Sequence, residues 1–222
     1  MRKIIATILT LSPVICFSQF GLKAGLNFAN VSNVSSINNS SRSGFHAGLL
    51  FSSSSKSVIS SRTELIFSRQ GYNYKTSTNT GNVNLDYIML PQYISINITK
   101  YFSIQLGGQM AYLINAKADS SNQSSSANPY GKMMDYYNRF DAGYGGGIEI
   151  HPVSGLLIGA RINISVSKLY NFDYTTDYSS YSTPPSPSFI PKVDVKNNVF
   201  QIFAGWRFGK QSKSSKKKKS SE

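Results

Sequence analysis

The side chains that most often carry catalysis or bind metals are sparse in this sequence. Histidine occurs twice, at His46 and His151, and the single cysteine is Cys16. A hydrolase could be assembled on paper from His46, a serine and Asp86 or Asp141, because a nucleophile needs a base and a group that orients it. The simpler interpretation is that these polar side chains pack inside the protein. Two histidines far apart, with no cysteine partner, do not form a zinc site. We predict no catalytic residue, no metal ligand and no cofactor.

Two further motifs suggest anion binding, but their context argues against it. The stretch GYGGG at residues 143–147 lacks the Lys-Ser/Thr pair and the helix that a phosphate loop requires. The lysine run at residues 216–219 could bind nucleic acid or lipid headgroups, but no aromatic residues for base stacking are interleaved with it. We interpret the glycines as strand positions and the lysines as part of a solvated tail, and we predict no nucleic-acid partner.

Several other charged side chains stand inside segments in which every second residue is apolar. In FGLKAGLNF, the apolar positions alternate with glycine, Lys23 and Asn27. A period of two places apolar side chains on one face of a β-strand and polar ones on the other. The alternation recurs along the chain and predicts eight strands: residues 20–28, 45–51, 58–74, 85–99, 102–114, 141–150, 156–167 and 200–208.

The segment LDYIMLPQYISINIT is less regular than the others. Its apolar residues change parity near Pro91, and proline cannot donate to a strand ladder. We therefore predict a β-bulge at Pro91 that changes which residues face inward.

The predicted connections alternate between long and short. The long ones cover residues 30–43, 75–81, 118–137 and 170–196, whereas the short ones cover 52–57, 99–101 and 151–155. Outer-membrane barrels have this pattern, with short periplasmic turns and longer extracellular loops. Because the strand number is even, both ends of the barrel chain are predicted on the periplasmic side.

The two ends of the chain differ from its body. Residues 1–18 have Arg2 and Lys3 before an apolar run, and we predict a signal peptide cleaved after Ser18. Lipidation at Cys16 is the alternative, although Ile15 is not the small residue that usually precedes such a cysteine. The net charge is +13, and removing the leader (+2) and residues 210–222 (six Lys, one Glu) leaves 13 − 2 − 5 = +6. We predict three parts: signal peptide 1–18, barrel 19–209 and basic tail 210–222.

Alternation alone does not say whether the apolar faces meet lipid or a soluble core. A soluble lipocalin-like periplasmic binder would point them inward. The leader, the loop pattern, the aromatic residues near strand ends and a charged fraction of only 15% favour lipid, since soluble surfaces carry about 25–35% charged residues. No later apolar run reaches the roughly 18 residues of a membrane helix. We predict an all-β protein, an eight-stranded antiparallel up-and-down transmembrane β-barrel.

A barrel of this strand number is just wide enough for side chains to fill. Polar residues on the inner faces would then form a buried network, in which opposite charges pair. A small porin or transport channel needs an open lumen, so it is an alternative to this interpretation. The predicted network contains Lys23, His46, Arg62, Glu64, Glu149, Arg161 and Arg207.

The last long loop is rich in tyrosine. Tyr170, Tyr174, Tyr178 and Tyr181 could form a recognition surface, because tyrosine offers rigid contact area with a polar tip. Packing of the loop on itself and on the barrel rim is an equal alternative.

Several segments together resemble the PorT-like outer-membrane β-barrel family of Bacteroidetes. They are FGLKAGLNFANVS, SGFHAGLLFS, LDYIMLPQYIS, FDAGYGGGIEI, GLLIGARINISVSKLYN and VFQIFAGWRFG, and they span residues 20–209. The resemblance implies an outer-membrane barrel without a catalytic motif, with outer-membrane lipid around it and envelope or type IX secretion proteins as partners. Such barrels usually end on an aromatic residue, whereas here Phe208 is followed by the basic tail.

Overall fold

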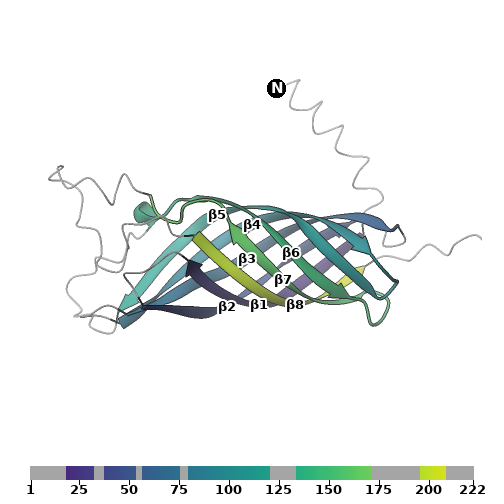
Figure 1. Cartoon of the computed structure of the whole chain (residues 1–222), viewed down its shortest axis with the longest axis horizontal. Coiled ribbons are helices and arrows are strands. Elements are labelled where there is room, and N and C mark those ends of the chain that lie inside the picture. Colours follow the sequence, from purple (N-terminus) through teal and green to yellow (C-terminus); the bar gives the residue numbers. More distant parts are fainter. Residues whose placement is uncertain are drawn as a thin grey trace, which may run out of the picture.

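The computed structural model describes residues 19–32, 38–53, 57–75, 80–120, 134–171 and 196–208. The predicted signal peptide and the basic tail lie outside these residues. Eight antiparallel strands close into one barrel, each pairing with the next (Figure 1). The strands are β1 (Gln19–Ser32), β2 (Asn38–Ser52), β3 (Ile59–Lys75), β4 (Thr80–Asn97), β5 (Phe102–Ser120), β6 (Phe140–Ile150), β7 (Leu156–Ser165) and β8 (Lys196–Phe208).

The barrel closes where the first strand meets the last. β1 pairs with β8 from Phe20 opposite Phe208 to Ser32 opposite Lys196. In the part of the barrel where all eight strands run side by side, each strand is therefore paired on both edges, which removes the aggregation risk of an open sheet. The prediction of an eight-stranded antiparallel barrel is confirmed. In the described part of the chain, no helix has the length and apolar character needed to cross a membrane.

Over most of the barrel, the outer face is apolar and the inner face is polar. Leu26 is 54% exposed and Leu106 is 58% exposed, whereas Lys23, Glu64 and Arg161 on the inner face are at most 2% exposed. Two groups of paired aromatic residues border this apolar surface: Phe20 with Phe51 and Phe208 at the end with the short turns, and Phe28 with Phe200 and Tyr112 with Phe140 at the other. Such aromatic girdles mark the two membrane interfaces. A soluble lipocalin-like binder requires the opposite arrangement, so this alternative is wrong.

The three longest strands continue past the outer girdle and reverse this pattern. β3, β4 and β5 have 17, 18 and 19 residues and, with the start of β2 paired alongside β3 (Asn38 opposite Lys75), extend beyond the other strands at the end away from the short turns (Figure 1). In this extension the inner face carries buried Tyr72 and Leu85, and the outer face carries exposed Lys75 and Lys117. The extension is therefore built like a soluble protein, with an apolar inside and a polar outside.

The predicted bulge at Pro91 is wrong. Odd-numbered residues of β4 are buried from Val83 to Ser95, and Pro91 stays in register opposite Gln109. The apolar residues change parity because the outer solvent changes from lipid to water, while the strand keeps its facing. The observed irregularity in the β4–β5 pairing lies between Asp86 and Tyr87.

Candidate functional site

A cluster of fully buried charges fills the centre of the barrel. The Glu64 carboxylate accepts two hydrogen bonds from Arg161, each 3.0 Å, and a third of 3.0 Å from Lys23 Nζ. The Arg161 guanidinium lies 3.8 Å from the centre of the Tyr93 ring, and Lys23 Nζ lies 3.7 Å from that of Phe203. These contacts matter because a buried charge is tolerated only when it is paired and hydrogen-bonded.

A second buried ion pair adjoins the first. Arg62 donates two hydrogen bonds to Glu149, one of them 2.7 Å from Nη2 to Oε1. Gln105 joins the two pairs, because its Nε2 donates to Glu149 (3.0 Å) and its Oε1 accepts from Arg161 (2.6 Å). Together with Lys23, this core holds three cations and two carboxylates, and its surplus charge is positive.

Neutral polar side chains fill the lumen above these charges. The Asn27 side chain contacts His46 Nδ1 at 2.8 Å, donates to Ser68 Oγ at 2.9 Å and accepts from Gln201 at 3.0 Å. Gln201 in turn accepts from Asn163 at 3.0 Å. The described polar side chains thus form a continuous network with contributions from all strands, which leaves the lumen filled rather than open.

A histidine in the β6–β7 turn extends the network to the short-turn end. His151 Nδ1 lies 3.0 Å from Arg207 Nη2, and His151 Nε2 lies 3.3 Å from Glu149 Oε1. Arginine can only donate, so Nδ1 must be the acceptor and Nε2 must carry the proton. Burial lowers the pKa of His151 from its ordinary value, which favours this neutral form. His151 therefore holds Arg207 in place without neutralising it.

Three tyrosines meet inside the extension. Tyr72 Oη lies 3.0 Å from Tyr137 Oη and 2.7 Å from Tyr170 Oη. Tyr137 and Tyr170 come from the connections after β5 and after β7, and their backbones pair in an isolated bridge. Apolar side chains of β3, β4 and β5 surround them in one buried cluster. The described parts of these two connections, residues 134–139 and 166–171, therefore pack together inside the extension.

The structure places all seven residues of the predicted lumen network on the inner face of the barrel or at its mouth. His151 and Tyr93 belong to the same network but were not among them. Tyr93 shares its parity with the buried residues of β4, and this signal could have found it. Tyr170 is 1% exposed, so its assignment to an exposed recognition surface is wrong, because its hydroxyl bonds inward to Tyr72. Tyr174, Tyr178 and Tyr181 lie outside the described residues.

No hydrolase arrangement forms among the described residues. His46 contacts Asn27, whereas Asp86 accepts from Arg69 and Asp141 accepts from Ser165. The histidine and the two aspartates considered from sequence thus have other partners.

Several solved structures of bacterial proteins are similar to this chain. Ail, the attachment invasion locus protein of Yersinia pestis, is 18% identical, with 86% of this chain and 97% of Ail covered and a TM-score of 0.45. OprG of Pseudomonas aeruginosa is 11% identical, covering 87% and 97%, and Neisserial surface protein A is 12% identical, covering 85% and 97%; both have a TM-score of 0.47. No curated protein sequence matches the chain significantly. Residues 16–171, which include β1 to β7, match the sequence profile described as "Outer membrane protein beta-barrel domain".

Proposed function

The chain belongs to the outer membrane protein beta-barrel domain family, and from this membership we propose that it is a non-enzymatic, non-conducting barrel with an interaction role at the cell envelope. The observation that carries the proposal is the filled lumen. Ion pairs and amide side chains occupy the membrane-spanning part, and the tyrosine cluster occupies the interior of the extension. A barrel filled in this way offers its rims and loops, rather than its interior, to other molecules.

The orientation that fits this role places the short turns in the periplasm. Outer-membrane barrels have short periplasmic turns and longer extracellular loops. The three short connections join β2 to β3, β4 to β5 and β6 to β7. The first residue of β1 and the last residue of β8 lie at the same end of the barrel. The extension of β3–β5 and the long loops then face the cell exterior, where they can contact surface partners.

We further propose that the chain acts in an envelope assembly of the type IX secretion kind. The resemblance of its strand segments to PorT-like barrels supports this finer assignment. Its test is capture of partners by a tagged full-length chain after crosslinking in whole cells. Recovery of envelope proteins that depends on crosslinking supports an assembly role, whereas recovery of the barrel alone counts against it.

Conductance in a planar bilayer tests the filled lumen directly. We expect the folded chain to show no channel events, and the same preparation to migrate faster on an SDS gel before boiling than after it. Discrete conductance steps from protein that passes the gel test would support the alternative of a small porin. A preparation without a gel shift would contradict the closed barrel itself.

A further inference from the structure

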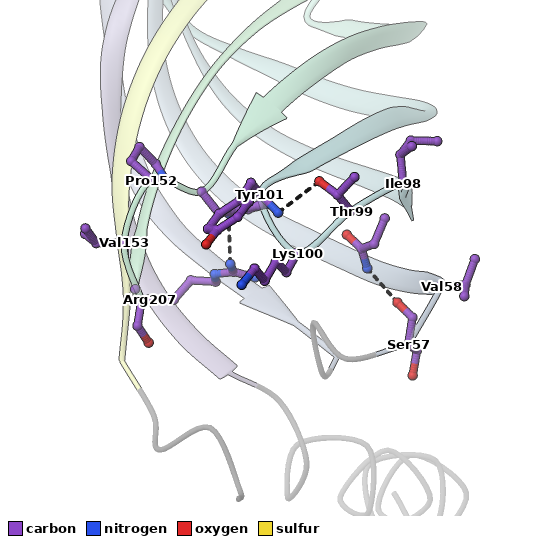
Figure 2. Close-up of a pocket in the computed structure, with 13 residues that line it drawn as sticks. Ser57, Val58, Ile98, Thr99, Lys100, Tyr101, Pro152, Val153 and Arg207 are labelled. Atoms are coloured by element: carbon purple, nitrogen blue, oxygen red, sulfur yellow. Dashed lines mark hydrogen bonds between the residues drawn. The ribbon is translucent and has the colours of Figure 1, made fainter. Parts of the chain in front are cut away.

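The short-turn end of the barrel contains a recess of about 760 Å³. It is lined by the β2–β3, β4–β5 and β6–β7 turns and by Arg207 of β8 (Figure 2). Because these elements stand around the strand ring, the recess lies across the mouth of the lumen. Its volume falls in the range of small-ligand sites, about 300–1,000 Å³.

Hydrogen bonds fix the lining elements to one another. Asn97 donates from its side chain to Ser57 O at 2.7 Å, which joins the first two turns. His151 N donates to Tyr101 O at 2.8 Å, and Arg207 N donates to Gly155 O at 2.8 Å. The rim is therefore preorganised, and a ligand would meet it without the cost of ordering loops.

The charge of the recess is positive. Arg207 is half-buried, and its guanidinium donates to the neutral His151. Lys100 adds a second cation, with Nζ 4.6 Å from the centre of the Tyr101 ring. No lining residue of the recess is acidic, and the nearby carboxylate of Glu149 is already bound by Arg62. A half-buried guanidinium in this setting is stabilised by an added anion.

The arginine and the apolar part of the lining indicate the kind of anion. Guanidinium binds a carboxylate through two parallel hydrogen bonds. Exposed apolar side chains also line the recess, among them Val58 (70% exposed), Val153 (55%) and Tyr101 (54%). An inorganic ion would leave these uncovered, whereas a peptide can contact them while its acidic side chain reaches Arg207. In Figure 2 the Arg207 and Lys100 side chains extend toward one another across the recess.

We propose that this recess binds an acidic peptide segment of a partner protein, with Arg207 as the main ligand of its carboxylate and Lys100 as the second. In the orientation proposed above, that partner is periplasmic. Only this location of the partner rests on the proposed function. The lysines that follow Phe208 in the sequence add positive charge to this end of the chain. Such charge raises the rate at which an acidic partner arrives.

The test is a fluorescence anisotropy titration of the full chain in nanodiscs of zwitterionic lipid, with a fluorescein-labelled Gly-Glu-Gly-Glu-Gly peptide as the probe. We expect Arg207→Gln to weaken binding about tenfold and Lys100→Gln about threefold, as loss of a charge-assisted contact predicts. Arg139→Gln, an exposed arginine beside the outer girdle, is the matched control and should bind as the parent does. Replacement of lysines 216–219 by serine should leave the tenfold effect of Arg207→Gln intact.

Parent-like binding by Arg207→Gln overturns the proposal, as does an equal loss in Arg139→Gln. If Arg207→Gln fails to fold, Lys100→Gln decides alone, and an unchanged affinity overturns the proposal. Displacement by inorganic phosphate as effective as by unlabelled peptide would reassign the recess to small oxyanions, and displacement by anionic nanodiscs would reassign it to lipid headgroups. None of these outcomes changes the expected gel shift or the expected lack of conductance, and these two measurements test the proposed function separately.

Discussion

The lumen has two regions that are buried by opposite chemistry. In the membrane-spanning part, Arg161, Lys23 and Glu64 are enclosed by strands whose outer face meets lipid. In the extension, Tyr72, Tyr137 and Leu85 are enclosed by strands whose outer face is polar. A strand has two faces, so the solvent outside decides which residues are left for the inside. Where lipid takes the apolar residues, charged side chains are left for the inside and must pair with one another. Where water takes the polar residues, the inside is an ordinary apolar core.

The largest expected effect comes from breaking the charge cluster. Glu64→Gln leaves Arg161 and Lys23 without their carboxylate, and loss of one partner from a buried pair costs about 3–5 kcal/mol. Urea unfolding in detergent micelles, followed by the gel shift, measures it. The matched control is Asp86→Asn, which breaks the Arg69 pair in the extension. The Arg69 side chain is 43% exposed, so this loss should stay near 1 kcal/mol. Equal losses in the two variants would show that the regions do not differ.

The next effect tests the outer face. Ala24 lies on the lipid-facing side of β1, midway between girdle residues Phe20 and Phe28. Ala24→Arg should cost about 2–4 kcal/mol in unfolding free energy, as a charge at the bilayer midplane does. Lys117 already lies exposed on the outer face of the extension, and Lys117→Leu should change stability by less than about 0.5 kcal/mol. A tolerated arginine at position 24 would place the membrane elsewhere on the barrel.

A smaller effect is expected from the tyrosine cluster. Tyr72→Phe removes the hydroxyl that bonds both Tyr137 and Tyr170 and leaves two buried hydroxyls with fewer partners, at about 1–3 kcal/mol. Hydrogen exchange should speed up at the amides of Asn138 and Asn171, which bond across the two connections. Exchange in β1 and β8 should stay as in the parent. Faster exchange throughout the barrel would show that the extension and the membrane part unfold together.

The smallest effect concerns pH. Because burial lowers the pKa of His151, its neutral form stabilises the fold above the ordinary value of about 6.5, and this contribution is lost as the pH falls through the lowered value. Glu149, Arg207 and Arg62 are the charged groups around it. We expect the unfolding midpoint of the parent to fall more between pH 7 and pH 5 than that of His151→Gln. Parallel curves would show that His151 does not titrate with folding.

The same two-region design explains what could be predicted from sequence. A bilayer imposes a strict period of two, so the strands and their number followed from alternation, whereas the inward side of Lys23, Glu64 and Arg161 also needed the loop pattern and the low charged fraction that indicated lipid outside. The prediction of a β-bulge at Pro91 was wrong because it assumed that one solvent surrounds the whole of β4. The prediction that Tyr170 lies on an exposed recognition surface was wrong for a related reason. No pattern in the sequence indicates that the extension has an apolar interior that a loop tyrosine can enter. The His151 contact with Arg207 arises because β8 pairs with β7 and so brings Arg207 beside the β6–β7 turn, which no local pattern records.

The bonds that fill the lumen also constrain how the chain can fold. Asn27 and Gln201 are separated by 174 positions, Glu64 and Arg161 by 97, and Arg62 and Glu149 by 87. Contacts at such separations form late, because the entropy of closing the intervening chain must be lost first. Until β8 reaches β1, the acidic and basic groups of the interior have not met all their partners, so a partly assembled ring gains little from them. Completion of the last strand, rather than the first, therefore commits the chain to its folded state.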